Sequence, residues 1–215
     1  MEIKLLADEL NSNDENNNFI RSVSYNGNDI DILITGIGTV FTTYRLTRVL
    51  NQNRYDMIMN TGIAGSFNKE LKIGEVVNVV SEEFADLGVE RKEEFFTLFE
   101  SGFVMPDEYP FKNGLLNATY DGLMLKKFRK VHGITSNVSH GNLSSILKMR
   151  EKYKGDIETM EGAAVFYVGA NMGIPCCQLR SISNYVEPHD STNWNIPLSI
   201  ENLKSSLIDV FKTLE

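Results

Sequence analysis

Glu161 is the first residue whose type and position suggest chemistry. It lies in residues 158–164, where an extended run ending near Ile157 gives way to small and apolar residues at helical spacing. A carboxylate at such a junction can point into the crevice at the carboxyl end of a sheet, where α/β folds bind ligands. The alternative is a structural carboxylate that interacts favourably with the helix dipole, and this segment alone favours that alternative.

Ser183 and Asn184 form a second polar strand end. They close residues 175–183, an apolar-rich run with the length of a buried strand. Two loops of small residues, 36–38 and 61–66, follow two further strand-like runs and would let a ligand come close to the backbone. If these four ends meet in one pocket, they form a small-molecule site with few polar anchors.

The glycine motif at residues 36–38 is the third candidate. Gly36 and Gly38 directly follow a strand-like run, and Thr39 is expected to cap the helix that comes next. Such a unit places backbone N–H groups at a crevice. No third glycine completes a dinucleotide fingerprint, and no GxxxxGK[ST] motif occurs in the chain. NAD and ATP are therefore rejected as leading ligands, and no cofactor is expected.

Glu187, His189 and Asp190 are residue types that bind metals. They lie on one loop, with no distant His or Cys partner at an obvious spacing, so a solvated loop is the better interpretation. His132 and His140 belong to no motif and are interpreted as structural. No metal site is predicted.

The elements that must position these residues alternate between strands and helices after an early hairpin. An Asn-Gly turn at residues 26–27, between two strand-like runs, predicts that hairpin. The expected strands are residues 19–25, 30–35, 56–60, 74–81, 131–138 and 175–183. The expected helices are residues 2–9, 40–50, 142–153, 161–170 and 198–214. This order predicts a single domain over residues 1–215, with a three-layer α/β/α fold around a central mixed sheet.

Composition narrows the function further. The formal net charge of -8 argues against nucleic acid as the main partner, because no basic field exists to release counterions. No apolar run is long enough to span a membrane, and no signal peptide opens the chain. The two cysteines, Cys176 and Cys177, are neighbours on an expected strand and point to opposite faces. A disulfide framework is therefore not expected, and the cytoplasm is the simplest compartment.

Four motifs together resemble the nucleoside phosphorylase and nucleosidase superfamily. In an order and spacing that fit nearly the whole chain, they are TGIG at 35–38, NTGIAG at 60–65, MEGAA at 160–164 and RSISN at 180–184. Three further segments are most similar to the futalosine hydrolases, namely FADLG at 84–88, NYVEPHD at 184–190 and WNIP at 194–197. Futalosine hydrolases remove the purine base from a nucleoside intermediate of menaquinone biosynthesis. The resemblance implies hydrolysis of the N-glycosidic bond of a purine nucleoside, with futalosine giving hypoxanthine and dehypoxanthinyl futalosine.

By this resemblance, Glu161, Met160 and Asn184 surround the reacting nucleoside. Glu161 would accept hydrogen bonds from the ribose hydroxyls and stabilise the oxocarbenium-like sugar, while Met160 would pack against that sugar. Asn184 stands where adenosine-type nucleosidases have an Asp that donates a proton to purine N7. An amide cannot be that acid, but it can donate and accept a hydrogen bond, which fits a 6-oxopurine. The alternatives are a core methionine and an asparagine that caps its own strand.

Glu2 matches the superfamily glutamate that positions and activates the attacking water. Members of the superfamily have a complete strand before that residue, whereas this chain has only Met1. Either the assigned start is truncated or the protein has lost its first strand, and in both cases that strand is expected to be lacking here. A general base one residue from a terminus would be poorly held, and loose placement is costly to rate. Glu2 is the candidate base, and the alternative is a solvated terminal carboxylate.

The remaining substrate contacts follow from the same resemblance. Val138 and Ser139 are expected beside the purine base. Trp194 is expected either to pack on the aromatic carboxylate tail of futalosine or to anchor the core. The other predicted substrate-binding residues are Gly36, Gly38, Ile63, Ala64, Gly65, Arg180 and Ser183.

Other functions stay open at this point. They are a methylthioadenosine/adenosylhomocysteine-type nucleosidase, a purine nucleoside phosphorylase, and a catalytically impaired nucleoside-binding protein, which the position of Glu2 keeps open. A phosphorylase would need donors for phosphate beside the ribose, and Arg45 and Arg180 are the candidates. Superfamily members are commonly dimers or larger, so the resemblance also implies a homodimer or higher homo-oligomer. Residues 91–103, which are charged and aromatic, are a candidate lid or interface.

Overall fold

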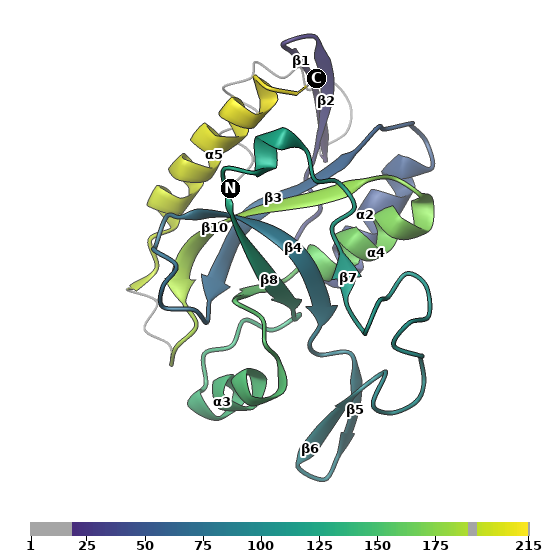
Figure 1. Ribbon diagram of the computed structural model, residues 1–215, viewed down its shortest axis with the longest axis vertical. Coiled ribbons are helices and arrows are strands. Elements are labelled where there is room, and N and C mark those ends of the chain that lie inside the picture. The colour runs from purple at the N-terminus through teal and green to yellow at the C-terminus, as the bar shows by residue number, and fades with distance from the viewer. Residues whose placement is uncertain (1–18, 189–192, 215) are drawn as a thin grey trace.

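The structure is a computed structural model that describes residues 19–188 and 193–214 (Figure 1). Its strands are β1 (Ile20–Tyr25), β2 (Asn28–Leu33), β3 (Ile58–Ser66), β4 (Val76–Phe84), β5 (Gly88–Arg91), β6 (Glu94–Thr97), β7 (Leu116–Asn117), β8 (Arg129–Thr135), β9 (Ile157–Thr159) and β10 (Cys176–Tyr185). Its helices are α2 (Thr39–Leu50), α3 (Leu143–Lys152), α4 (Gly162–Met172) and α5 (Ile196–Phe211), with a short 3-10 helix at Leu123–Leu125.

Six of the strands form one mixed sheet in the order β10-β3-β9-β8-β4-β7. Strand β10 runs parallel to β3, and β8 runs parallel to both β4 and β9. Strand β3 runs antiparallel to β9. Strand β10 also pairs antiparallel with β4, where Leu179 lies opposite Asn78, so five strands close into a ring. The expected central mixed sheet is confirmed.

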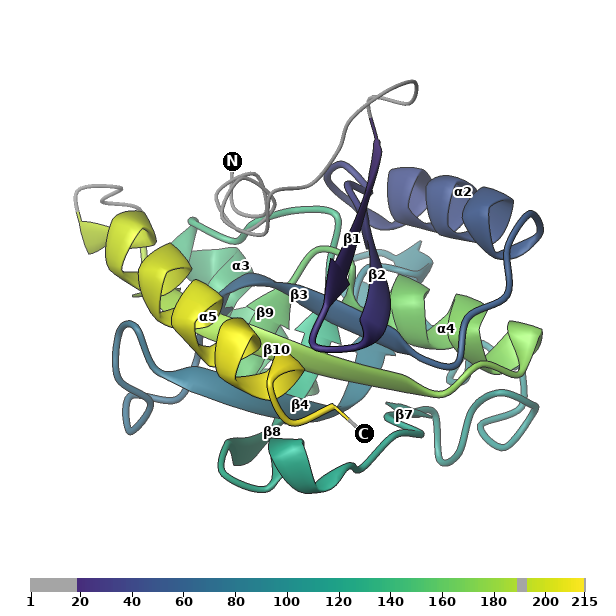
Figure 2. The ribbon, with the colours of Figure 1, turned by 90° about the horizontal axis from the view of Figure 1, so that it is seen from above.

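Helices cover both outer sides of this sheet (Figure 2). Helix α5 packs on β10 and β3, while α4 packs on β8, β10 and β4, and α2 packs against α4. The α5 layer buries Leu203 and Leu207 against Leu179, and the α2–α4 layer buries Leu46 against Val165. The three-layer α/β arrangement predicted from the sequence is therefore confirmed.

The inside of the ring is apolar over part of its length. Branched aliphatic side chains from four strands meet there without exposure to water: Val77, Val79, Val131, Ile157 and Ile182. Burial of this set removes apolar surface from water and fixes the register of strands that are far apart in the sequence.

One predicted loop is a strand. Residues 61–66 were expected to form a loop of small residues, but β3 continues through them to Ser66. The parallel ladder with β10 extends equally far, from Ile58 opposite Cys176 to Ser66 opposite Tyr185. The glycines of this run are therefore sites of close packing within the sheet: a Cβ at Gly65 would lie 2.9 Å from Val186.

Several predicted boundaries also change. Strand β8 ends at Thr135, three residues earlier than expected, and β10 extends to Tyr185. Helix α5 begins at Ile196, because the Asn195 side chain accepts a hydrogen bond from the Leu198 N–H and Pro197 suits a first turn. Residues 91–103, expected as a lid or interface element, contribute to a hairpin of β5 and β6.

The early hairpin and the free thiols agree with the sequence. Strands β1 and β2 pair antiparallel around the Asn26–Gly27 turn, both of whose residues have positive φ. Cys176 and Cys177 are buried and unbonded to each other. The predicted helix over residues 2–9 and the expectation of a lacking first strand concern residues outside the described ranges.

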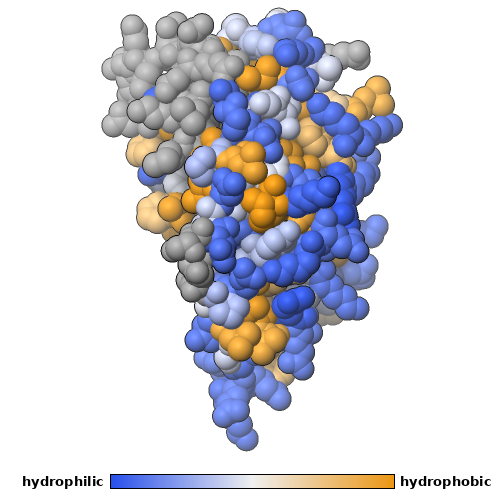
Figure 3. Space-filling model, turned by 90° about the vertical axis from the view of Figure 1, so that its left-hand side faces the viewer, coloured by the Kyte–Doolittle hydropathy of each residue, from blue (hydrophilic) through white to orange (hydrophobic). Residues whose placement is uncertain are grey.

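The surface seen in Figure 3 is largely hydrophilic, with apolar residues in separate groups. Within residues 19–188 and 193–214, no helix has the length and apolar composition needed to cross a membrane.

Candidate active site

Glu161 stands at the junction that the sequence predicted, between β9 and α4. It is the N-cap residue of α4, but its side chain makes no capping hydrogen bond to that helix. Its Oε1 instead accepts a hydrogen bond from the Gly38 N–H at 3.1 Å, and its Oε2 lies 3.4 Å from Nη2 of Arg180. The side chain is 17% exposed, so the carboxylate is oriented by the protein and still reaches solvent. The carboxylate also lies at the N-terminus of α4, so a favourable interaction with the helix dipole stays open beside the proposed role.

Arg180 is the charged partner of Glu161 and is itself buried in β10. Its Nη1 donates to the Ile63 carbonyl oxygen at 3.3 Å. Its Nε is buried and has no hydrogen-bond partner. An arginine held in this way fixes a carboxylate in place and leaves one donor unused.

Ser183 and Asn184 lie further along β10. The Ser183 hydroxyl is within hydrogen-bond distance of the Ala64 carbonyl (3.2 Å) and of Asn184 Oδ1 (2.7 Å). Asn184 Nδ2 donates to the Tyr185 carbonyl at 3.1 Å, and Asn184 lies opposite Gly65 in the ladder. The asparagine thus bonds its own backbone, as the alternative interpretation expects, and one of its two N–H protons remains available to a ligand.

The Gly36–Gly38 motif approaches from the start of α2. The backbone at Gly36 and Gly38 has positive φ, 84° and 90°, which favours glycine. Gly38, and not Thr39, is the N-cap residue of α2, so the predicted cap is wrong by one position. The Thr39 N–H and hydroxyl both donate to Asn137 Oδ1 at 2.9 Å, so a side chain from another segment caps this helix.

Asn137 belongs to the loop after β8, and the sequence analysis missed it. Its backbone and side-chain N–H groups donate to Asp86 Oδ2 at 2.6 Å and 3.0 Å. Val138, predicted beside the base, follows it and is 58% exposed. Asp86 lies in the FADLG segment, a motif in the sequence that suggested no role for this carboxylate. Its role became clear only from its hydrogen bonds to Asn137.

The same loop is anchored at its other end by His140 and Glu158. His140 Nδ1 is hydrogen-bonded to Glu158 Oε1, and the His140 N–H donates to Glu158 Oε2 at 3.2 Å. Glu158 lies opposite Gly65 in the β3–β9 ladder. His140 is therefore structural, as predicted, and it holds the loop beside the strand positions that neighbour Asn184.

The other predicted residues fall as follows. Met160 is half-buried between β9 and Glu161, and Trp194 is half-buried just before α5. Arg45, a phosphate candidate, has its guanidinium 3.7 Å from the centre of the Phe19 ring and donates to the Ile34 carbonyl at 3.1 Å. Glu2 lies outside the described residues, so its role as base stays a prediction. Among the described residues, no cluster of three potential metal ligands occurs.

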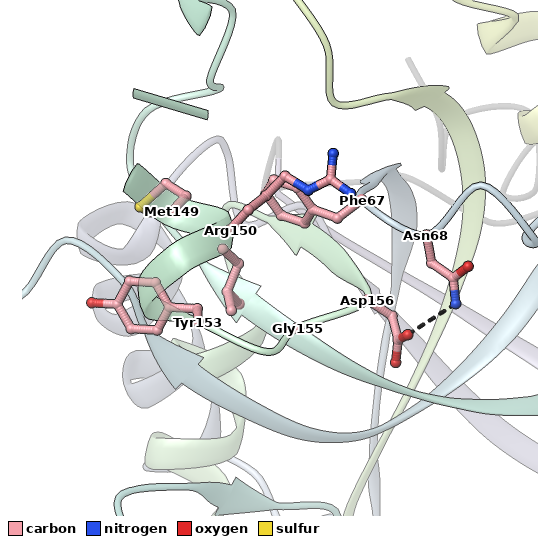
Figure 4. A pocket seen from close by; sticks show the side chains of 8 residues that line it. Phe67, Asn68, Met149, Arg150, Tyr153, Gly155 and Asp156 are labelled. Atoms are coloured by element: carbon pink, nitrogen blue, oxygen red, sulfur yellow. Dashed lines mark hydrogen bonds between the residues drawn. The ribbon is translucent and has the colours of Figure 1, made fainter. Parts of the chain in front are cut away.

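A separate hollow lies between α3 and the end of β3 (Figure 4). Its volume is about 160 Å³, below the range usual for drug-sized ligands. Asn68 Nδ2 donates to Asp156 Oδ1 across it at 3.1 Å. Its lining residues are Phe67, Asn68, Ile134, Met149, Arg150, Tyr153, Gly155 and Asp156. None of them is a predicted site residue, so this hollow is distinct from the group around Glu161.

The candidate site therefore follows neighbouring positions on β10 and β3, at the end of the ring where α2 and α4 begin. Glu161, Arg180 and the Gly38 N–H lie at one end, Ser183 and Asn184 lie further along β10, and β3 runs beside both. The carboxylate at one end can stabilise a ligand that develops positive charge, and the amide donors beyond it can bind a neutral polar group. Such a site is typical of α/β enzymes that act on small molecules.

The chain belongs to the phosphorylase superfamily, whose sequence model matches residues 2–213. It is 28% identical to a futalosine hydrolase of Streptomyces coelicolor over 191 residues, which covers 86% of this chain and 80% of that protein. It is also 28% identical to a 5'-methylthioadenosine/S-adenosylhomocysteine nucleosidase of Buchnera aphidicola, covering 83% and 76%.

Solved structures agree on the fold. The native structure of futalosine hydrolase of Helicobacter pylori superposes with a TM-score of 0.83 at 19% identity, covering 99% of this chain and 94% of that chain. A methylthioadenosine/adenosylhomocysteine nucleosidase from Neisseria meningitidis, in complex with methylthio-immucillin-A, gives 0.82 at 17% identity, covering 99% and 95%.

Proposed function

We propose that this protein hydrolyses the N-glycosidic bond of a purine nucleoside, and that futalosine is its substrate. The products are hypoxanthine and dehypoxanthinyl futalosine, which assigns the protein to menaquinone biosynthesis. The observation that carries the proposal is the Glu161 carboxylate, which is released from its own helix and held by Gly38 and Arg180. The curated relatives named futalosine hydrolase support the choice of substrate.

The chemistry follows from charge. Breaking the bond builds positive charge on the ribose and negative charge on the leaving base. Glu161 places negative charge at the ribose, where it stabilises the oxocarbenium-like sugar more in the transition state than in the ground state. Arg180 holds this carboxylate in place, and Met160 is the apolar wall beside it. The attacking water would be activated by Glu2, which remains part of the proposal only.

Asn184 determines the preference for the base. Its available N–H proton can donate to purine N7 or O6, and an amide does not protonate N7. Hypoxanthine carries an oxygen at C6 that can accept a hydrogen bond from the neutral Asn184 amide. Adenine leaves more readily when an acid protonates it, and an amide cannot supply that proton. Ile63, Ala64, Gly65, Ser183, Val138 and Trp194 complete the proposed binding residues, together with Gly36.

Hydrolysis is favoured over phosphorolysis by the state of the two arginines. Arg45 is stacked on Phe19 and bonded to the Ile34 carbonyl, and Arg180 is paired with Glu161. A phosphate beside the ribose would have to compete with the Glu161 carboxylate for Arg180, at a cost in like-charge repulsion.

The test is release of hypoxanthine from futalosine, with and without phosphate, beside release of adenine from methylthioadenosine. We expect phosphate-independent hypoxanthine release, with futalosine preferred at least about tenfold in kcat/KM, the size of the net free energy of one hydrogen bond. Release that depends on phosphate would make the protein a phosphorylase. Equal or faster cleavage of methylthioadenosine would make it a nucleosidase of that type, and binding of hypoxanthine without turnover would make it a nucleoside-binding protein.

A second variant pins the base preference to one residue. Asn184→Asp supplies the carboxyl group that an adenine leaving group needs, so we expect the ratio of adenine to hypoxanthine release to rise. An unchanged ratio in a folded variant would exclude Asn184 as the residue that selects the base.

We also propose that the protein is a homodimer or a higher homo-oligomer, and that it is cytoplasmic, as its two free thiols favour. Ile37, Val40, Phe41 and Tyr44 are 71%, 75%, 57% and 65% exposed. Val40, Phe41 and Tyr44 lie within one turn of α2, so these three side chains form an apolar surface at the start of that helix, next to Gly38, and Ile37 precedes them in the chain.

The oligomer is tested by light scattering of the intact chain. We expect Val40→Glu to reduce the mass to that of a monomer. The control is Leu123→Glu, at an equally exposed residue (78%) on the 3-10 helix, which should leave the mass unchanged. Phe103→Glu tests the other candidate interface, residues 91–103, and loss of assembly in that variant alone would move the interface there.

A further inference from the structure

A polar cluster is buried inside the ring below the start of α4. Glu82 from β4 is fully buried there. Its carboxylate accepts hydrogen bonds from Gln178 Nε2 at 2.6 Å, Thr135 Oγ1 at 2.9 Å and Thr159 Oγ1 at 3.2 Å. Gln178 Oε1 in turn accepts from Asn60 Nδ2. All five strands of the ring thus contribute to one hydrogen-bond network that the proposed reaction does not use.

This network reaches the backbone of α4. The Gly162 N–H donates to Thr159 Oγ1 at 3.2 Å, and the Ala163 N–H donates to Thr135 Oγ1 at 2.8 Å. The first N–H groups of a helix have no partner within the helix, and the N-cap side chain usually accepts from them. Here two threonines from neighbouring strands do so, and the N-cap residue Glu161 does not.

Proton counting gives the network a direction. Each threonine hydroxyl has one proton, and when it accepts from an α4 amide it can donate that proton to Glu82. Both hydroxyls lie against the Glu82 oxygens and 3.1 Å from each other, and each accepts from an α4 amide.

Glu82 and the start of α4 are in direct contact, with no space for a side chain between them. A Cβ at Gly162 would lie 2.0 Å from Glu82 Oε1, and a Cβ at Gly133 would lie 2.5 Å from the same atom. Glycine at both positions therefore lets the helix backbone and β8 contact the carboxylate directly.

We propose that Glu82 is a positioning residue for the active site: it orients Thr135 and Thr159 to cap α4, which frees the Glu161 carboxylate from its own helix to face the ribose. Only one part of the inference rests on the proposed function, namely that the freed Glu161 carboxylate faces the ribose of a bound nucleoside. The capping role itself concerns hydrogen bonds between described residues and can be tested without substrate.

The test uses three variants and one control. Glu82→Gln replaces one carboxylate oxygen with an NH2 group, so either Gln178 or Thr135 loses its acceptor. Thr135→Val removes the hydroxyl at constant shape. Thr135→Ser restores the hydroxyl. Glu83→Gln is the matched control, because Glu83 is the next residue of β4, so its side chain points to the opposite face, and its carboxylate is not among the hydrogen-bond partners of α4.

The substrate-free readout is hydrogen exchange of the Ala163 amide by NMR. We expect exchange at least about tenfold faster in Glu82→Gln and Thr135→Val, the size of one lost hydrogen bond, and unchanged in Thr135→Ser and Glu83→Gln. Unchanged protection in both Glu82→Gln and Thr135→Val overturns the inference, whatever the protein hydrolyses. So does equal loss of protection in the control.

The kinetic readout uses futalosine. Misplacing a catalytic group by about 1 Å can cost about 100-fold, so we expect kcat to fall by about 10- to 100-fold in Glu82→Gln and Thr135→Val, with KM changed much less. Thr135→Ser should recover to near wild type, as should Glu83→Gln. If wild type releases no base from any purine nucleoside, the proposed function fails and the exchange result stands alone. If exchange rises but kcat does not fall, the network caps α4 without positioning Glu161, and the inference is wrong.

Discussion

The two helices that meet at the site begin in opposite ways. Helix α2 is capped by Asn137, which is exposed and is hydrogen-bonded in turn to Asp86. The N–H of its N-cap residue, Gly38, donates to Glu161. Helix α4 is capped by Thr135 and Thr159, which are buried. Neither helix uses the side chain of its own N-cap residue.

The difference separates a fixed part of the site from an exchangeable part. Hydrogen bonds inside the ring have no water to replace them, so breaking them costs the full desolvation penalty. The bonds at α2 are open to solvent and can be exchanged for bonds to a ligand at little cost. We infer that α4 holds Glu161 rigidly while the glycine motif adjusts around the nucleoside.

Glu161→Gln is the variant with the largest expected effect. It removes the charge that stabilises the ribose, so we expect kcat for futalosine to fall by about 1000-fold, comparable to loss of a transition-state contact. The variant also leaves the buried Arg180 charge without its partner, so the melting temperature should fall as well. Because Glu161 does not cap α4, hydrogen exchange of the Ala163 amide should stay unchanged, and faster exchange would contradict the comparison.

Gly162→Ala tests the closeness of the buried cap. The added methyl group would overlap the Glu82 carboxylate, and overpacking of this kind costs about 1–3 kcal/mol. For a chain of this size we expect the melting temperature to fall by roughly 2–4 °C for each kcal/mol. Gly102→Asn is the control, since Gly102 has positive φ, which Asn tolerates, and nothing within 4 Å of an added Cβ. Equal effects of the two variants would contradict a close contact at Gly162.

The pH dependence of stability tests the ionisation of Glu82, the carboxyl group below the buried cap of α4. Burial raises the pKa of Glu82 from 4.5 to about 7, against the opposing effect of its hydrogen bonds and of Arg180 on β10. The folded state thus favours the protonated form, so the stability from this group is complete below about pH 4.5 and is lost as the pH rises through about 7.

We therefore expect Glu82→Gln to narrow the difference in melting temperature between pH 5 and pH 8 relative to wild type. Burial also raises the pKa of Glu83 to about 7, so Glu83→Gln should narrow it as well, and the double variant should narrow it most. A wider difference in Glu82→Gln would reverse the sign argued here.

Asn137→Ala is the variant with the smallest expected effect. It removes the exposed cap of α2, and loss of an N-cap costs about 1 kcal/mol. We expect a fall in melting temperature of roughly 2–4 °C and a KM for futalosine raised a few-fold, with kcat nearly unchanged. A loss of kcat as large as that of Thr135→Val would show that the two helix starts are equally important, and would remove the distinction between them.

The sequence predicted the parts of the fold that repeat locally. Period-2 and helical patterns located the hairpin at Asn26 and Gly27 and the junction at Glu161, because such patterns depend on a few neighbouring residues. It failed at residues 61–66, where glycines suggested a loop. The partner strand β10 supplies the backbone bonds that keep this run extended, and that partner is more than a hundred residues away in the sequence.

The candidate site divides in the same way. Glu161, Arg180 and Asn184 could be selected because each lies in a short motif. Glu82, Thr135 and Thr159 could not, because a Glu in a Val-rich strand and two threonines at strand ends have no individual signature. Their role depends on the closure of the sheet, which brings β4, β8 and β9 together below α4.

That closure also bears on how the chain is made. Strand β10, which seals the ring between β3 and β4, follows the other strands of the ring in chain order. Until it arrives, one edge of β3 and one edge of β4 present unpaired backbone groups, which is the exposure that promotes aggregation. Contacts between residues so distant in sequence also form slowly. The interval between the synthesis of β4 and that of β10 is thus the period when this protein most needs protection by chaperones.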